Sequence, residues 1–512
     1  MKPNGKEDFT GGAETRRSEE EQRVISSLAS SDLRVSASPV LPSAVSLLAA
    51  ALLMLIVGCA VGPDYRQSAT VADTAAWVTP QPTGVAIPIA RWWTVYGDDG
   101  LARLVDEALT SGLDVRVASA RLREARAAVG LSEAPLLPYG NASGGVTRDR
   151  ASANRRGGGA RPQYTTTWTA GLDATWEIDL FGGNRREVEA TVAELGAVAA
   201  DLGAVRSSVA AEVALAWIDL TSANQRLGLA ERTIVNQQAD HRLATVRFDA
   251  GLVAASDLAE ADAQIAQTAA QLPAIIAAQS QARVRLAVLL GRPPQQAAAL
   301  PAAPAVLPRP RELLELGLPS DLLRRRPDIV RAERELAAAT ARIGVATADW
   351  FPRFSLMGAF GYESTGGGKF VSRPNQFWSI GPAIRWPILS AWGIAANVRA
   401  ANAGTERAAL HYERTVLAAL GEVENAVVAV LSEQDRGQQL DLALAAQERS
   451  LGFARVRFER GLDAYDTVLR AERLLISVHD QVVLSRRAVC QGLAALAKAL
   501  GGGWNAEPIA AK

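Results

Sequence analysis

Two long stretches of the chain carry apolar residues at steps of three and four, the spacing of a helix packed along its whole length. The first runs without proline from Asn184 to about Ala250. It would span about 67 residues, on the order of 100 Å of helix. The second runs from Ile394 to Arg460. Because the mean helix of a globular domain is only about 11–12 residues long, these lengths predict a rod, a coiled coil or the wall of a tube.

Shorter stretches before each long helix alternate apolar and polar residues with period two, which predicts β-strands. One apolar face spans Trp168–Leu180 and another spans Trp378–Ile388. Preceding strands are predicted at Phe354–Tyr362 and, where the alternation is weak, at Tyr139–Arg148. Such strands suit a transmembrane β-barrel, although a soluble sandwich gives the same alternation. Because about eight strands are the practical minimum for a barrel, membrane strands would have to be pooled between copies.

The two halves of the chain repeat one another. The stretch VRFDAGLVAASDLAEAD at Val246–Asp262 parallels VRFERGLDAYDTVLRAE at Val456–Glu472, an offset of about 210 residues. Each half is predicted to contain a helix, two strands, a very long helix and a shorter helix. The predicted segments are a leader with a signal peptide (1–58), an N-terminal segment (59–95), a first repeat (96–300), a Pro-rich linker (301–326) and a second repeat (327–512).

Both long helices are predicted to end at the same turn. Gly251 and Gly461 can adopt the left-handed conformation that terminates a helix. Ser256 or Asp257 is expected to cap the helix after the first turn, with Glu260 placed for a capping box. The resulting hairpin tips are either a geometric consequence of the fold or a docking surface, and the leucines after the glycines favour docking. The predicted docking residues are Arg247, Phe248, Gly251, Leu252, Arg457, Phe458, Gly461 and Leu462.

An uncharged stretch from Ala44 to Gly58 ends at Cys59. Its length of about 15 residues is too short for a bilayer span and suits a signal-peptide core. The Ile-Val-Gly-Cys ending resembles a bacterial lipobox, so Cys59 is the predicted lipidation site. A buried helix ending in Gly-Cys is the alternative. Ala60, in the place where aspartate would retain a lipoprotein at the inner membrane, indicates the outer membrane.

Residues 1–40 fit this signal poorly because they are polar and precede it instead of forming its basic end. An unusual leader extension and a start codon assigned too early both explain them. We favour the early start and infer no structure from the segment.

The composition mainly excludes classes of function. The formal net charge is +0, so we expect no nucleic-acid partner. Aromatic residues make up only 5% of the chain, which favours long, closely packed helices over an aromatic-rich enzyme core. His241, His411 and His479 have no metal-ligand spacing, and GGGK before Phe370 lacks the hydroxyl residue of a phosphate loop. Cys490 lies in a helical pattern and is expected to be a buried, inert thiol. We therefore predict no enzyme activity, no metal and no cofactor besides the lipid.

Several motifs together carry a family resemblance: CAVGPDY, RWWTVYGDDGLARLVDEAL, WEIDLFGGNRR, LLRRRPDI and the two VRF..GL turns. In this order they resemble the outer-membrane factor proteins, the TolC-like efflux channels, and within them the lipidated OprM and NodT branch. The similarity extends from Cys59 to Ala499. Each motif alone would be weak, whereas the combination is specific.

The resemblance implies a mainly α fold with a small β part. A homotrimer would form one 12-stranded transmembrane barrel, four strands per protomer, continuous with a long periplasmic helical barrel. The protein would be a lipid-anchored outer-membrane exit channel of a tripartite, RND-type pump in a Gram-negative bacterium, passing drugs or other small molecules. Its tips would meet a periplasmic adaptor coupled to an inner-membrane transporter. A lipid-anchored periplasmic adaptor or coiled-coil interaction protein is the alternative.

The same resemblance implies places for particular residues. Trp92 and Trp93 would lie in an equatorial region beside the tube, and Asp179 to Arg185 would form the strand-to-helix junction. The family closes its periplasmic end with charges just after the second tip. The candidates here are Asp463, Asp466, Arg470 and Arg473.

Arg470 departs from the family pattern, since relatives often have an aspartate at this position. We therefore predict a charge ring built from Asp463 or Asp466, paired with arginine. A solvated helix start is the alternative interpretation.

Overall fold

The computed structural model describes residues 60–66, 77–79, 89–150, 164–310, 319–366 and 368–504. All of them belong to one compact unit. The predicted signal peptide and Cys59 lie outside the described residues.

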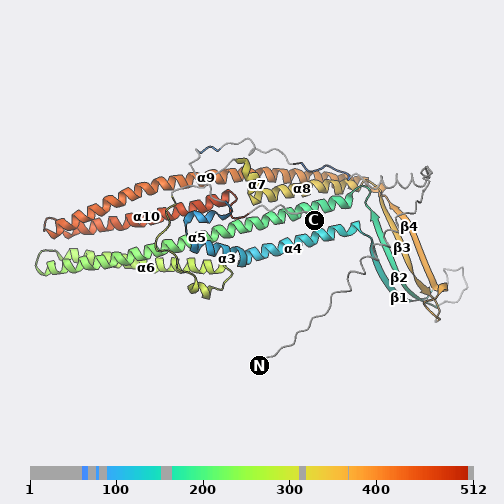
Figure 1. Cartoon of the computed structure of the whole chain (residues 1–512), viewed down its shortest axis with the longest axis horizontal. Coiled ribbons are helices and arrows are strands. Elements are labelled where there is room, and N and C mark those ends of the chain that lie inside the picture. Colours follow the sequence, from blue (N-terminus) through green and yellow to red (C-terminus); the bar gives the residue numbers. More distant parts are fainter. Residues whose placement is uncertain are drawn as a thin grey trace, which may run out of the picture. The chain divides into compact units, whose positions relative to one another are not determined.

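The secondary-structure elements follow the predicted order in both halves (Figure 1). The first half contains η2 (Ile89–Tyr96), α3 (Asp99–Ser111), α4 (Leu113–Glu133), β1 (Tyr139–Arg150), β2 (Tyr164–Ile178), α5 (Gly183–Asp249) and α6 (Ala255–Leu289). The second half contains α7 (Leu322–Arg325), α8 (Pro327–Ala348), β3 (Arg353–Ser364), β4 (Gln376–Arg385), α9 (Ala391–Glu459) and α10 (Tyr465–Ala499). The long helices α5 and α9 have 67 and 69 residues, which confirms the lengths expected from periodicity.

Two local predictions need correction. The second strand of each half ends earlier than predicted. In the first half it ends at Ile178 rather than Leu180. In the second half it ends at Arg385 rather than Ile388, because Pro387 lacks the N–H that a sheet ladder needs and the chain turns there into a 3₁₀ helix. The cap of α6 is Ala254, which makes no side-chain cap bond. The helix begins at Ala255, so Ser256 and Asp257 already lie inside its first turn.

The four strands form one antiparallel sheet in the order β1-β2-β3-β4. Its register aligns apolar side chains of neighbouring strands, as in the row Leu172, Phe360 and Trp378. All three are exposed, Trp378 to 70%. The next row, on the opposite face, includes Asp173 and Ser379. One face is therefore apolar and uncovered within the chain, as lipid-facing strands require.

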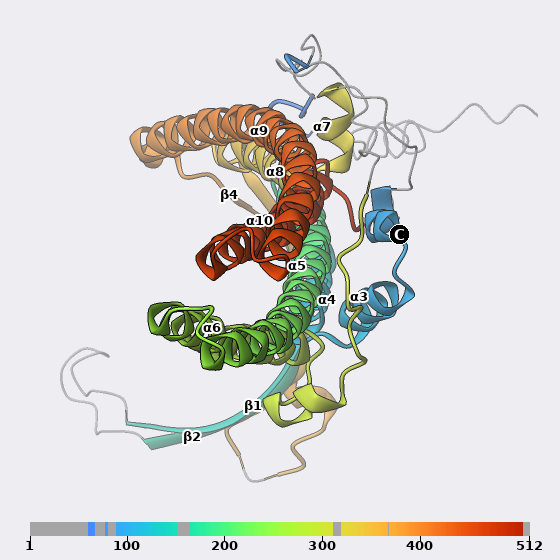
Figure 2. The same ribbon diagram turned by 90° about the vertical axis from the view of Figure 1, so that its left-hand side faces the viewer.

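The helices form a curved wall. α5 packs against α4, α6 and α8, while α9 packs against α8 and α10. Viewed along the wall, these helices follow an arc with α3 on its convex side (Figure 2). Most buried residues of α5 are alanine, glycine or serine, so neighbouring helices can approach closely.

The flank of α9 is less well covered. Of the described helices, the stretch Ile388–Glu459 alone is apolar and long enough to cross a membrane. Only 28% of its most apolar 18-residue segment is buried within the chain. Its apolar surface therefore needs lipid or another protein surface as a neighbour.

The main core lies beside the middle of the wall. Trp92 and Trp93 are almost fully buried there, and the Tyr96 hydroxyl donates to the carbonyl of Cys490 at 2.6 Å. Burial raises the pKa of the Cys490 thiol to about 12. The thiol therefore stays protonated and unreactive, which confirms the buried cysteine that the sequence predicted.

Arg326 in the LLRRRPDI motif joins three helices. Its guanidinium pairs with Asp328 at 2.6 Å and with Glu422 of α9 at 2.8 Å. It also donates to the carbonyl of Ala499 in α10 at 3.0 Å. Pro327 begins α8 immediately afterwards, a position that needs no backbone N–H.

Candidate functional sites

Both hairpin tips close with the same Schellman turn. In the first tip Gly251 has φ +78°. Its N–H donates to Phe248 O, and the N–H of Leu252 donates to Arg247 O, both at 2.8 Å. In the second tip Gly461 has φ +73°, and the corresponding bonds are both 2.9 Å. A left-handed residue without a Cβ is needed at each turn, as the sequence predicted.

The docking residues differ in exposure between the tips. Leu252 and Leu462 are 74% and 62% exposed, and Phe248 is 39% exposed. Phe458 is only 5% exposed, because its ring packs against Tyr465 with centroids 5.1 Å apart. Phe458 therefore supports the tip from inside and offers little surface to a partner.

Arg247 links the two tips. Its guanidinium lies 4.3 Å from the centre of the Phe458 ring. It donates to the carbonyl of Phe458 at 2.7 Å and to that of Glu459 at 3.0 Å. The sequence placed Arg247 in a docking surface and gave no sign of this contact.

The four gate candidates are all paired within the chain. Asp463 pairs with Arg457 at 2.7 Å, and Arg457 lowers the pKa of this carboxyl. Asp466 pairs with Arg470 at 2.6 Å. Arg473 pairs with Glu260 of α6 at 2.5 Å.

A buried charge cluster above the second tip was missed by the sequence analysis. Arg455 of α9 pairs with Asp240 of α5 at 2.7 Å and with Glu472 of α10 at 2.8 Å. The Glu472 side chain is only 5% exposed. Burial, together with the neighbouring Asp240, raises the pKa of Glu472 to about 7 despite Arg455. The three residues share no motif, so only the packing of the halves reveals them.

The strand-to-helix junction takes the predicted form. Asp179 accepts a bond from the Arg185 N–H at 2.9 Å, and its carbonyl accepts from the Arg185 side chain at 3.0 Å. Gly182 has φ +76°, and a Cβ there would lie 2.6 Å from the Cα of Ala60. The residue that follows Cys59 is therefore packed where the sheet meets the helical wall.

Arg186 holds the rest of the N-terminal motif. Its guanidinium donates to the carbonyls of Val61 at 3.0 Å and Gly62 at 3.3 Å, and it pairs with Asp64 at 2.7 Å. A Cβ on Gly62 would come within 2.4 Å of the Cα of Gly344. The part of the CAVGPDY motif after Cys59 is thus explained by close packing against α5 and α8.

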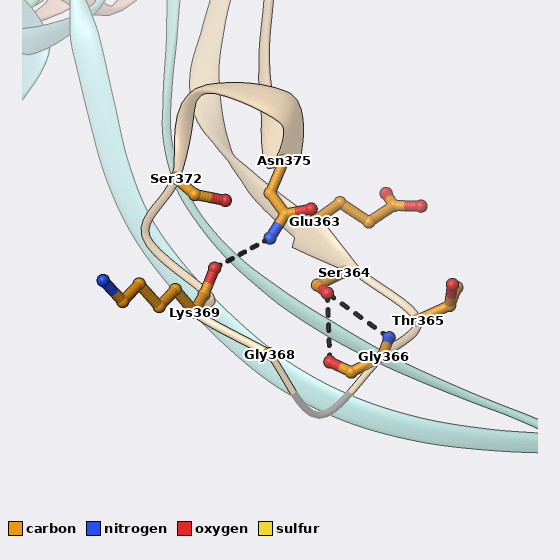
Figure 3. Close-up of a pocket in the computed structure, with 8 residues that line it drawn as sticks. All are labelled: Glu363, Ser364, Thr365, Gly366, Gly368, Lys369, Ser372 and Asn375. Carbon is orange, nitrogen blue, oxygen red and sulfur yellow. Dashed lines mark hydrogen bonds between the residues drawn. The ribbon is translucent and has the colours of Figure 1, made fainter.

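The glycine-rich loop between β3 and β4 surrounds an open cavity of about 620 Å³ (Figure 3). Asn375 donates to the carbonyl of Lys369 at 3.1 Å, and Ser364 donates to that of Gly366 at 3.2 Å. The loop leads into a strand, whereas a phosphate loop opens a helix. Among the described residues, no group of three or more His, Cys, Asp or Glu is placed to hold a metal ion.

Comparisons with known proteins agree with this architecture. The family model described as "Outer membrane efflux protein" matches residues 104–292 and 318–502. Outer membrane protein OprJ of Pseudomonas aeruginosa is 31% identical over 89% of this chain and 95% of its own length. Nodulation protein T of Rhizobium leguminosarum bv. trifolii is 28% identical over 89% and 97%.

Solved structures give the same result. The outer-membrane channel OprN superimposes with a TM-score of 0.80 and 35% identity, covering 87% of this chain and all of OprN. CusC gives a TM-score of 0.76 at 27% identity, covering 87% of this chain and all of CusC.

An exposed apolar sheet continuous with a long helical wall defines a TolC-like channel subunit. The chain belongs to the outer membrane efflux protein family. It is an outer-membrane channel component of an efflux pump in a Gram-negative bacterium. The family match therefore excludes the alternative prediction that the chain is a periplasmic adaptor or a coiled-coil interaction protein.

Proposed function

We propose that three copies of the chain assemble into a passive exit duct. Each copy gives four strands to a 12-stranded barrel and its helices to a periplasmic tube. The observation that carries this proposal is that the sheet and the wall are open at the same two flanks. β1 and β4 are the edge strands, and the helices joined to them, α4 and α9, end the helical wall.

Such flanks can be closed together by copies of the same chain. Pairing β4 of one copy with β1 of the next would place α9 of the first beside α4 of the second. Exposed apolar side chains on both helices favour this contact, since large uncovered patches usually mark an interface. They include Val117 and Leu131 on α4 and Leu410, Leu417 and Val428 on α9.

The duct would have no chemistry or energy source of its own. An RND-type transporter in the inner membrane would drive export of drugs or other small molecules, and a periplasmic adaptor would dock on the tips. Leu252 and Leu462 are exposed in the turns between α5 and α6 and between α9 and α10. These turns lie at the end of the wall away from the sheet (Figure 1). They are suited to a hydrophobic contact with adaptor helices.

Cys59 is proposed to carry acyl chains such as palmitate. Support comes from the adjoining Ala60, which lies at the junction of sheet and wall. Each buried methylene would add about 0.8 kcal/mol, assisting the anchoring provided by the sheet.

The assembly is tested by fractionation and by heat-modifiable migration of the detergent-purified protein. We expect outer-membrane recovery and a band near three times the mass of the processed chain, which would begin at Cys59 and be lighter than the 54.1 kDa of the full sequence. This band should fall to one chain on heating. A monomer that stays soluble without detergent would exclude the proposal. Drug sensitivity of a deletion strain, restored by the wild-type gene, tests the export function.

Docking is tested with Leu252→Glu/Leu462→Glu. We expect this variant to form trimers and to leave the deletion strain drug-sensitive, because a charge cannot be buried unpaired at an apolar contact. The control is Val306→Glu, another exposed apolar position, far from the tips. Full resistance in the double variant would rule out docking through these leucines.

We also propose that Asp463 or Asp466, each held by an arginine, narrows the periplasmic end. Replacing both aspartates with alanine should increase bilayer conductance, since the arginines lose the partners that fix them. Unchanged current in the double variant would rule out this gate.

A further inference from the structure

A groove of about 610 Å³ lies between α8 and α9. Charged residues dominate its polar lining, which consists of Glu335, Arg342, Arg407, His411 and Arg414. The Thr405 hydroxyl of α9 lies 3.0 Å from the carbonyl of Ala339 in α8, so the two helices are in contact at this level. All of these residues come from one chain, and Leu410, which also lines the groove, lies on the flank of α9 that faces the next copy in the proposed trimer.

The groove opens on the concave side of the wall. Tyr412 and Val416 of α9 are buried in the core. Arg414 lies about 200° around the helix from Tyr412, and Arg407 is two turns before Arg414 on the same face. Because α3 covers the convex side (Figure 2), these arginines point away from the core. In the proposed trimer this side is the lumen.

The carboxylates around the groove already have partners. Glu335 accepts from Arg331 at 3.0 Å, and Arg331 also pairs with Asp201 of α5 at 3.2 Å. Glu194 of α5 pairs with Arg342. These acids are therefore not available to neutralise further cations.

Two guanidinium groups of the groove have no carboxylate partner among the described residues. Arg407 and Arg414 are exposed, and neither makes an ion pair within the part of the chain that the structure describes. Arg414 contacts the Nδ1 atom of His411 at 3.0 Å, and because guanidinium has only donors, the histidine nitrogen is the acceptor. Both arginines keep donors free on the groove side.

We propose that this groove is a transit subsite for anionic cargo, specifically small molecules that carry two or more carboxylates. The inference rests on the proposed trimeric duct and adds a substrate class to it. Arginine forks match carboxylates in bidentate geometry, and two of them about 10 Å apart along α9 suit a polycarboxylate better than a single charge. Exposure to water keeps the binding weak, as passage through a duct requires.

The test uses citrate on the detergent-purified trimer and on single channels in bilayers. We expect wild type to bind citrate in low salt and to prefer anions in a salt gradient. Arg407→Gln/Arg414→Gln should bind citrate about tenfold more weakly and shift the reversal potential towards cation preference. Arg103→Gln/Arg309→Gln, which removes the same charge from exposed positions outside the groove, should match wild type in both measurements.

The possible outcomes distinguish this inference from the proposed function on which it rests. A conducting trimer that binds no citrate, or a groove variant with wild-type affinity and reversal potential, overturns the subsite and leaves the duct intact. Failure of the wild-type protein to form trimers or conduct would overturn the duct, and the subsite with it. Heat-modifiable migration of the variants shows that the charge change, and not assembly, is being measured.

Discussion

The two hairpin tips have the same backbone and different side-chain partners. Arg247 and Arg457 occupy equivalent positions in identical turns. Arg457 pairs with Asp463 of its own turn at 2.7 Å, whereas Arg247 reaches across to the carbonyl of Phe458 at 2.7 Å. The residue that matches Asp463 in the first tip is Val253, which cannot accept a hydrogen bond from its side chain. The side chain at this one position therefore determines whether the arginine of a tip pairs within its own turn or contacts the other tip.

The same asymmetry continues above the tips. Arg455 and Glu472 of the second hairpin form a buried pair that also reaches Asp240 of α5. Their equivalents in the first hairpin are Thr245 and Asp262. The first hairpin therefore has no such arginine, although Arg473 of α10 and Glu260 of α6 also pair across the two hairpins. Duplication preserved the turns, while the charges that join the hairpins differ between the halves.

The largest effect is expected from Arg455→Met. It leaves Asp240 and Glu472 facing each other without a cation, so Glu472 must either take up a proton or keep an uncompensated buried charge, and both are destabilising at neutral pH. Because Arg455 is itself 36% exposed, we expect a moderate loss of about 2 kcal/mol in the local opening free energy of early α10. Hydrogen exchange there should accelerate about 30-fold.

The control for this change is Arg470→Met, which removes an exposed pair with Asp466 four residues away. Its expected cost is below about 0.5 kcal/mol. Equal exchange rates in the two variants would show that the Arg455 cluster does not join the hairpins more strongly than a surface pair.

An effect of similar size is expected from pH. The pKa of Glu472 is raised from its ordinary value of 4.5 to about 7, so between these values the folded tip holds a proton that the opened tip releases. Stability of the second hairpin should therefore fall as pH rises through about 5 to 7. Asp240 and Arg455 are the charged groups facing this carboxyl, and Tyr465 lies close by.

Hydrogen exchange of early α10, corrected for its intrinsic pH dependence, measures this effect. Glu472→Gln should remove most of the pH dependence in that pH range. Persistence of the full dependence in Glu472→Gln would assign it to another group.

Local features of both tips follow from the sequence because their causes are local. A repeat of three and four residues defines a helix, and a glycine with positive φ ends it, as at Gly251 and Gly461. The ends of strands are harder to predict. A single proline, Pro387, ends the strand although the alternation of apolar and polar residues continues past it. The alternating pattern also predicts which face of the sheet is apolar, because successive side chains of a pleated strand point to opposite faces.

Contacts between the halves do not follow from either half. Phe248 and Phe458 lie in the same VRF motif, yet only Phe458 is buried, because Tyr465 packs on it where the first tip has Ala255. The Arg247 contact and the Arg455 cluster likewise depend on how one hairpin lies against the other. No spacing along the chain encodes that arrangement.

The smallest and most specific effect is expected from exchanging the side chains that differ. Val253→Asp gives the first tip the carboxylate of the second, so Arg247 should turn back to its own turn as Arg457 does. The cost should be about 1 kcal/mol, since Val253 is half-buried against the apolar cluster of the tips and the substitution loses part of that packing. Spin labels on Asp249→Cys and Arg460→Cys should report a broader distribution of distances between the tips, because a cross-tip contact has been lost.

Asp463→Val is the matched change in the other tip. It frees Arg457 from its turn but leaves Arg247 on the Phe458 carbonyl, so the distance between the tips should keep its wild-type distribution. If Val253→Asp also kept that distribution, Arg247 would not be what holds the tips together. The Arg455 cluster and the Arg473–Glu260 pair would then carry the polar connection, and the difference between Val253 and Asp463 would matter only within each turn.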